Sequence, residues 1–162
     1  MTGTTWATWT AGARVLGVAL VVVALPVSAF AALGGDAASV ESDRVRMKGA
    51  LLRIVRSDAY TLHEVQSSSG TTVREYVSST GTVFAVAWQG PWLPNLRQIL
   101  GTYFDQYQRT VQAAQGRRRA RGSLAIDQPD LVVQMSGHPR AFSGRAYVPR
   151  LLPQSIQADV IR

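Results

Sequence analysis

Apolar and polar positions form their clearest pattern in the middle of the chain, over residues 60–88. TTVREYV (residues 71–77) and TVFAVAW (residues 82–88) are rich in the β-branched and aromatic residues that strands prefer. SSSG and SSTG, residues 67–70 and 78–81, precede them and are typical of turns, because glycine adopts positive φ without strain. With residues 60–66 as a further strand, this pattern predicts a three-stranded antiparallel meander.

The third of these strands is apolar on both sides. Side chains alternate along a strand, so we expect one set to face one way (Val83, Ala85 and Ala87) and the other set to face the opposite way (Phe84, Val86 and Trp88). A strand with two apolar faces is expected at the centre of a sheet that is covered on both sides.

A helical pattern follows the turn Gly90–Pro94. Apolar side chains recur at three- and four-residue spacing through about Gln112, which predicts one long amphipathic helix (Leu93, Leu96, Leu100, Tyr103, Tyr107 and Val111). Pro94 suits a first-turn position, where a missing N–H costs nothing. Gly101 lies inside the pattern, and a close approach between helix and sheet would explain it.

The other segments predict further elements. Residues 38–48 suggest a short helix with acidic residues in its first turn, and residues 50–56 fit either a strand or more helix. Residues 131–135 and 141–148 read as two strands around a turn.

The predicted order of elements indicates one domain over residues 32–162. We expect an α+β fold, in which an antiparallel β-meander sheet of about five strands packs against one long helix, with a short N-terminal helix. A basic flexible loop is expected at about residues 115–125.

The N-terminus has the pattern of a secretory signal peptide. Arg14 precedes an apolar run from Val15 to Leu25, and Ala29-Phe30-Ala31 has small residues where signal peptidase reads them. We expect residues 1–31 to be removed after Ala31. The protein would then be periplasmic or secreted, and would contact a membrane only transiently through the signal peptide. The alternative is a membrane anchor, because low polarity continues to Leu33.

The charge is positive and concentrated in one place. The formal net charge is +7, and four arginines stand together (Arg117, Arg118, Arg119 and Arg121). They could meet envelope phosphates or an acidic partner, or form a solvated loop. Nucleic acid is not an expected partner of an exported chain without a nucleic-acid-binding motif. The absence of cysteine excludes a disulfide framework.

Two long segments resemble a known family. GTTVREYVSSTGTVFAVAWQGPWLPNLRQILGTYFDQY and GRAYVPRLLP are similar to an uncharacterised family of small exported proteins of Gram-negative bacteria, domain-of-unknown-function family 2844. Asn95 stands where the family pattern often has aspartate, which caps a helix equally well. The resemblance implies export and a shared fold, and no reaction. The matching residues are Gly70, Arg74, Glu75, Tyr76, Gly81, Phe84, Trp88, Gly90, Pro91, Leu96, Gly101, Gly144, Arg145, Tyr147 and Pro149.

Residues with catalytic chemistry are few. His63 and His138 are the only histidines, no common catalytic motif is present, and we expect no catalytic set, metal site or cofactor. Glu64 and Glu75 could form a carboxylate pair on adjacent strands, which leaves a small hydrolase as an alternative. Strand glutamates also pair with arginines across a sheet, here Arg74 or Arg145.

Binding has more candidates than catalysis. Trp92 in a turn, Tyr147 beside Arg145, and the charged pair Arg74 and Glu75 suit recognition of a protein, peptide or sugar. We therefore expect a non-catalytic binding protein for a cell-envelope component or a protein partner. Trp92 and Tyr147 could instead close the core beneath the helix. A third interpretation is an inhibitor of another secreted protein that presents the turn Gly90–Pro94 as a wedge.

Overall fold

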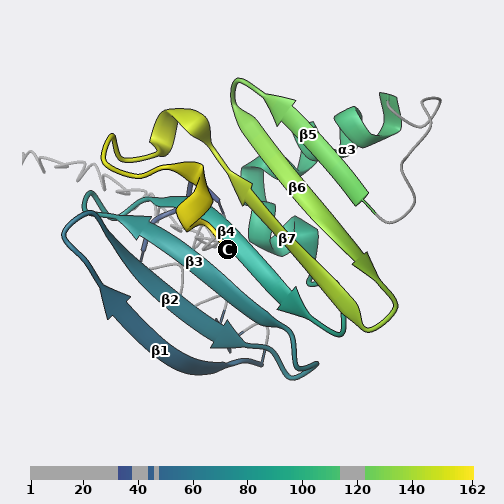
Figure 1. Cartoon of the computed structure of the whole chain (residues 1–162), viewed down its shortest axis with the longest axis horizontal. Helices are drawn as coiled ribbons and strands as arrows, with labels where there is room; N and C mark the ends of the chain where they lie inside the picture. The colour runs from purple at the N-terminus through teal and green to yellow at the C-terminus, as the bar shows by residue number, and fades with distance from the viewer. Residues whose placement is uncertain (1–32, 38–43, 46–47, 114–122) are drawn as a thin grey trace, which may run out of the picture.

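Seven antiparallel strands form one sheet in the computed structural model, which describes residues 33–37, 44–45, 48–113 and 123–162 (Figure 1). The first meander is β1 (Ala50–Arg56), β2 (Tyr60–Gln66), β3 (Thr72–Ser78) and β4 (Val83–Gly90). The second is β5 (Ser123–Gln128), β6 (Leu131–His138) and β7 (Ala141–Tyr147). The strand order is β1-β2-β3-β4-β7-β6-β5, so β4 and β7 join the two meanders.

The helical layer lies between the two meanders in sequence and against one face of the sheet in space (Figure 1). It consists of α2 (Leu96–Leu100), the 3-10 turn η1 (Gly101–Tyr103) and α3 (Phe104–Ala113), which confirms the expected long helix. Asn95 caps α2, since its side-chain oxygen accepts a hydrogen bond from the Gln98 backbone N–H at 3.3 Å. Pro94 therefore precedes the helix rather than occupying its first turn.

Gly101 breaks this helix into two pieces. Its φ is 51°, in the left-handed region that glycine adopts readily. The reason for a glycine at this position is therefore the backbone conformation, and the expected explanation by close approach to the sheet is not needed.

Each face of the sheet carries its own core. On the helix face, strand residues such as Val73, Val86 and Trp88 pack against Ile99 and Leu100 of α2. On the opposite face, here called the tail face, Tyr76, Phe84, Ala85 and Ala87 are covered by residues of the C-terminal segment, including the fully buried Ile161. That segment contains the 3-10 turns η3 (Pro149–Leu151) and η4 (Ala158–Val160) and crosses the sheet in front of β3, β4 and β7 (Figure 1).

A β-bulge sets the orientation of β4. The pairing of β3 with β4 shifts register between Tyr76 and Val77. As a result Val83 faces the helix with Val86 and Trp88, whereas Phe84 faces the tail with Ala85 and Ala87. The expected strict alternation was wrong for Val83 and Phe84, although the prediction of a central strand buried on both faces is confirmed.

The strand β1 is exposed along its whole length at one edge of the sheet. Leu52 forms a bulge, because the pairing with β2 shifts between Leu51 and Arg53. Its exposed aliphatic residues are Leu51, Leu52, Ile54 and Val55.

Several expectations need correction. The sheet has seven strands rather than about five: residues 50–56 are a strand, and residues 123–128, partly assigned to a loop, form β5. The short N-terminal helix is not matched, since within residues 44–45 and 48–49 Arg44 and Val45 are helical and Lys48 has a left-handed φ of 46°. The signal peptide and residues 114–122 lie outside the described residues.

No helix in the described ranges is both long and apolar enough to span a bilayer.

Candidate functional site

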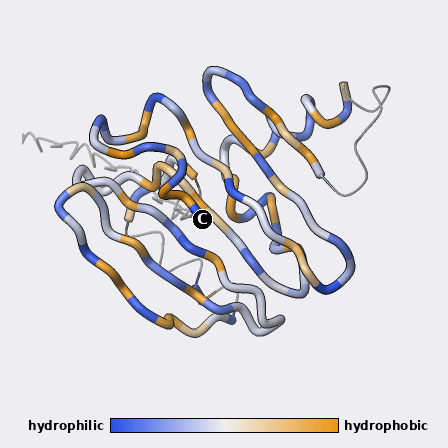
Figure 2. The backbone as a smooth tube through the Cα atoms, in the orientation of Figure 1, coloured by the Kyte–Doolittle hydropathy of each residue, from blue (hydrophilic) through white to orange (hydrophobic). Residues whose placement is uncertain are grey.

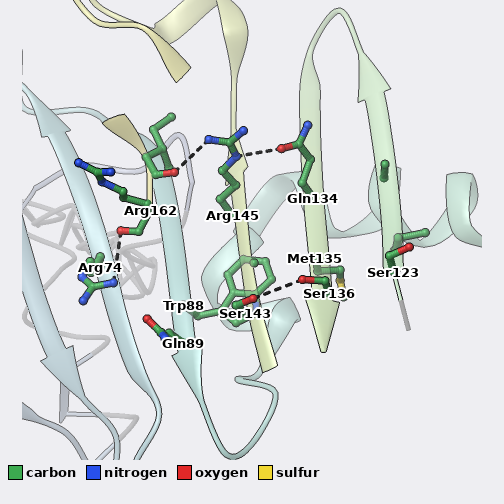
Figure 3. Close-up of a pocket in the computed structure, with 14 residues that line it drawn as sticks. Arg74, Trp88, Gln89, Ser123, Gln134, Met135, Ser136, Ser143, Arg145 and Arg162 are labelled. Atoms are coloured by element: carbon green, nitrogen blue, oxygen red, sulfur yellow. Dashed lines mark hydrogen bonds between the residues drawn. The ribbon is translucent and has the colours of Figure 1, made fainter. Parts of the chain in front are cut away.

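An open groove of about 540 Å³ lies on the tail face, over β4, β7, β6 and β5 (Figure 3). Sheet register explains its lining. Gln89, Ser143, Ser136 and Ser123 lie in one row across the four strands. Side chains at every second position of a strand share a face, so small hydroxyl and amide groups cover this part of the sheet, where polar and apolar residues alternate along the strands (Figure 2).

A second row of the same face carries the positive charge. Arg74 on β3 is aligned with Ala87 on β4, which is aligned with Arg145 on β7 and then Gln134 on β6. Arg162 of the C-terminal segment also lines the groove. Among the described residues, no aspartate or glutamate side chain lines it, so the groove is cationic, and Trp88, Leu124, Met135 and Ile161 add apolar surface to its lining.

Arg145 lines the groove and is held in place by hydrogen bonds to neutral groups (Figure 3). Its Nε donates to Oε1 of Gln134 at 2.9 Å, and its Nη1 donates to the carbonyls of Ala158 at 2.6 Å and Ile161 at 3.1 Å. In the part of the chain that the structure describes, no carboxylate side chain forms an ion pair with this half-buried guanidinium. Within the described residues, its positive charge therefore borders the groove with neutral hydrogen-bond partners.

Arg74 has a different environment from Arg145. Its Nε lies 2.6 Å from Oε2 of Glu64, and its Nη1 donates to the main-chain oxygen of Arg162 at 3.3 Å. Arg53 lies 3.5 Å from the same Glu64 oxygen. The expectation of a cross-strand arginine partner for a strand glutamate is confirmed for Glu64 and Arg74.

Glu64 and Glu75 cannot serve one substrate as a pair. Glu64 is on the tail face between two arginines, whereas Glu75 points to the helix face and is 1% exposed. The expected carboxylate pair does not form because Glu64 is aligned with Arg74, not with Glu75. Arg74 and Glu75 are consecutive on β3, so their side chains point to opposite faces, and the Glu64 and Glu75 carboxylates therefore do too.

His63 is the residue aligned with Glu75 on the adjacent strand. Burial lowers the pKa of His63 below its ordinary value of 6.5, and the positive charge of Arg56 lowers it further. His138 is exposed at the end of β6. Within the described residues, no group of three or more histidines, aspartates and glutamates could hold a metal ion.

The predicted binding residues are divided between three places. Arg74 and Arg145 line the groove, and Tyr147 follows Arg145 by two positions on the same face, half-buried beneath the tail. Glu75 lies on the other side of the sheet. Trp92 is 59% exposed in the turn after β4, where Thr71 Oγ1 donates to its carbonyl at 2.7 Å and accepts from its N–H at 3.3 Å.

The serine row and the C-terminal segment were not anticipated. The serine row had a signal in the sequence, since Gln134 and Ser136 alternate with Val133, Met135 and Gly137, and Ser143 and Arg145 alternate with Phe142, Gly144 and Ala146. The position of residues 153–162 on the tail face had none, because its hydrogen bonds come from side chains that are distant in sequence. Arg117, Arg118, Arg119 and Arg121 lie outside the described residues.

Comparison with protein families gives a match to the family described as "Protein of unknown function (DUF2844)", over residues 29–161. The matched range includes every strand and the helical layer. Comparisons with curated proteins and with solved structures give no match. Because the family model covers most of the sequence, the chain belongs to the DUF2844 family.

Proposed function

We propose that this protein is an exported, non-catalytic binding protein whose groove on the tail face binds an anionic polar chain of the cell envelope. The observation that carries the proposal is Arg145, a half-buried cation that lines an open groove and has neutral hydrogen-bond partners. Leaving water is costly for a cation that no anion compensates. A phosphate or carboxylate group of a ligand would supply that anion.

The polar part of the lining fits a hydroxyl-rich ligand, and apolar side chains such as Trp88, Leu124 and Met135 can contact the carbon skeleton of such a ligand. Ser123, Ser136 and Ser143 offer hydroxyls that both donate and accept, and Gln89 and Gln134 offer amides. Arginine binds phosphate and carboxylate through a planar fork, which fixes orientation as well as charge. An open groove across four strands can accept part of a long chain without enclosing it.

The carboxylates support binding more than hydrolysis. Glycoside hydrolysis requires two carboxyl groups on opposite sides of one bond within the same site. Glu64 is engaged by Arg74 and Arg53, and Glu75 is buried on the other side of the sheet. Neither is aimed at the groove, so a hydrolase using Glu64 or Glu75 has no observation in its favour.

The test is binding of purified protein to lipopolysaccharide, measured by isothermal titration calorimetry. Arg145→Gln should weaken binding by at least about tenfold, because a hydrogen bond to a charged group contributes roughly 1.5–3 kcal/mol and about 1.4 kcal/mol is a factor of ten. Arg109→Gln, at an exposed position of α3 on the helix side, removes the same charge and should leave affinity nearly unchanged. Equal losses of affinity in the two variants would show that only net charge matters, and would overturn the proposal that the groove is the binding site.

Two further arms identify the ligand group and the contributing arginines. Dephosphorylated lipopolysaccharide should bind more weakly than the intact form if phosphate is recognised, whereas polygalacturonate tests carboxylate. Replacing Arg117, Arg118, Arg119 and Arg121 by serine tests the sequence hypothesis that the basic segment binds envelope phosphates. If this variant loses binding and Arg145→Gln does not, the basic segment rather than the groove is the binding element.

A second candidate is recognition of another exported protein through the turn Gly90–Pro94. Its support is Trp92, which is largely exposed and yet held at its main chain by the buried Thr71. A rigid exposed tryptophan is a frequent anchor of protein interfaces. Trp92→Ala should then remove a partner that co-purifies from the periplasm, while Arg145→Gln should retain it.

A further inference from the structure

Three side chains of the sheet converge on the main chain of the C-terminal segment, residues 158–162. Arg145 donates to the carbonyls of Ala158 and Ile161, and Arg74 donates to the main-chain oxygen of Arg162. The Tyr76 hydroxyl accepts from the Arg162 N–H at 3.1 Å. Its single hydrogen is shared between the main-chain oxygens of Arg162 at 3.0 Å and Val160 at 3.3 Å. All of these hydrogen bonds recognise main-chain atoms, so they do not depend on the sequence of the segment.

One side chain supplies the selectivity. Ile161 is fully buried on the tail face beside Tyr76, Ala85 and Ala87. The short side chains of the two alanines leave room above β4, and the isoleucine fills it. Val160 is only partly buried against the same cluster, and Asp159 and Arg162 are exposed, so the strictest requirement for an aliphatic residue is at Ile161.

The segment is held differently from the strands. Counting partners among the described residues, the main chain of residues 153–162 forms hydrogen bonds within local turns and to side chains of the sheet, and none to the main chain of a strand. Elements with few cooperative hydrogen bonds open at lower free energy than the strands of a core. Residues 158–162 can therefore leave without breaking a ladder of the sheet.

We propose that the tail face has a binding site for an extended peptide with an aliphatic residue, formed by Arg74, Tyr76 and Arg145 together with Ala85 and Ala87 of β4. Residues 158–162 occupy this site in the free protein. Main-chain hydrogen bonds combined with a pocket for one side chain are the usual basis of peptide recognition in grooves. The ligand is a peptide segment of a partner protein, which displaces the chain's own segment.

The location of the segment gives its release a consequence. It lies between the groove of about 540 Å³ and a second hollow of about 590 Å³ that includes Arg53, Tyr60 and Asp159. Arg74, Gln89 and Arg162 line both. Because the two hollows share these three residues, release of the segment would join them on the tail face.

The experiment uses the full chain carrying Ile161→Asp, which places a carboxylate where the apolar pocket excludes it and so weakens the intramolecular occupant. The probe is a fluorescent peptide of residues 153–162, acetylated at its N-terminus, followed by fluorescence anisotropy. The variant should bind the peptide saturably. Wild type should bind it at least tenfold more weakly, because its own segment competes at an effective concentration in the millimolar range.

A matched peptide and a matched variant make the result specific. The same peptide with Ile161→Asp should bind at least tenfold more weakly, and adding Tyr76→Phe to the receptor should weaken binding of the natural peptide. Absence of peptide binding to folded Ile161→Asp protein, or equal binding of the two peptides, would overturn the proposal. If Ile161→Asp does not fold, Ile161→Ala serves as receptor with the same two peptides and the same criteria.

The outcome is separable from that of the proposed function. Tyr76→Phe retains Arg74 and Arg145 and should leave lipopolysaccharide binding unchanged. Loss of lipopolysaccharide binding in that variant would show that the two sites are one, and would overturn the assignment of Tyr76 to peptide main chain alone. Peptide binding with no lipopolysaccharide binding would support the peptide site and refute the anionic ligand.

Discussion

Arg74 on β3 and Glu64 on β2 form an ion pair of 2.6 Å across adjacent strands, with side chains that are 24% and 11% exposed. Arg97 and Asp105 of the helical layer form a contrasting pair, separated by 3.7 Å and 66% and 70% exposed. The same chain therefore contains a largely buried and a largely exposed pair of the same chemistry.

The buried pair should matter far more for stability than the exposed pair. Glu64→Gln leaves the half-buried Arg74 without its anion and should lower the free energy of unfolding by about 1–3 kcal/mol. Asp105→Asn should change it by less than about 1 kcal/mol, because exposed pairs are screened by solvent. Urea unfolding followed by circular dichroism measures both. Equal effects would mean that solvent reaches Glu64 more freely than the structure indicates.

Phe84 is fully buried on the tail face, where it packs edge-on against Tyr60 with ring centroids 6.3 Å apart. Phe84→Ala should lower the free energy of unfolding by about 3–5 kcal/mol, as expected for a large-to-small change in a packed core. Trp92→Ala, at an exposed position, should remain within about 0.5 kcal/mol of wild type. A loss below about 1 kcal/mol for Phe84→Ala would contradict the central position of β4.

His63 gives the protein a pH dependence of known direction. The lowered pKa means that, just below pH 6.5, the unfolded chain binds more protons than the folded one. The stability contributed by neutral His63 is therefore present above pH 6.5 and is lost as the pH falls through the lowered folded pKa. His63→Gln should lose less stability than wild type between about pH 7.5 and about pH 5 in chemical unfolding.

The control for that measurement is His138→Gln, since His138 is exposed at the end of β6. It should retain the pH dependence of wild type. If His138→Gln flattens the profile and His63→Gln does not, the assignment to the partly buried histidine is wrong.

Removal of residues 1–31 remains a prediction from the sequence. Mature protein recovered from the periplasm or the medium should begin at Ala32, one residue before the buried Leu33. Mass spectrometry of the intact protein checks this. An intact N-terminus on membrane-embedded protein would establish the alternative anchor.

The meander and the long helix were predictable because they depend on local signals. Turns ending in Gly70 and Gly81, both with positive φ, define the hairpins, and Asn95 defines the start of α2. Strand β5 was missed because SLAIDQ is short and follows a run of arginines, which favours a loop in a local interpretation. Its identity as a strand comes from pairing with β6.

The candidate site was predicted less well than the fold. Arg74 and Arg145 could be chosen as residues, but their common location requires β3 and β7 to lie on either side of β4, which depends on the order of the strands. The orientation of Phe84 depends on a bulge that no single-sequence pattern reveals. Register and strand order are tertiary properties, and they decide which side chains meet.

The exposed strand β1 also bears on how the protein behaves at high concentration. An edge strand with aliphatic side chains is a template on which another chain can add a strand. The bulge at Leu52 interrupts that template, and Arg56 places a repelling charge along it, whereas Arg53 already lies against Glu64. Protection of this edge then depends in part on charge, so salt that screens Arg56 should promote fibril nucleation at β1 while the protein is still folded.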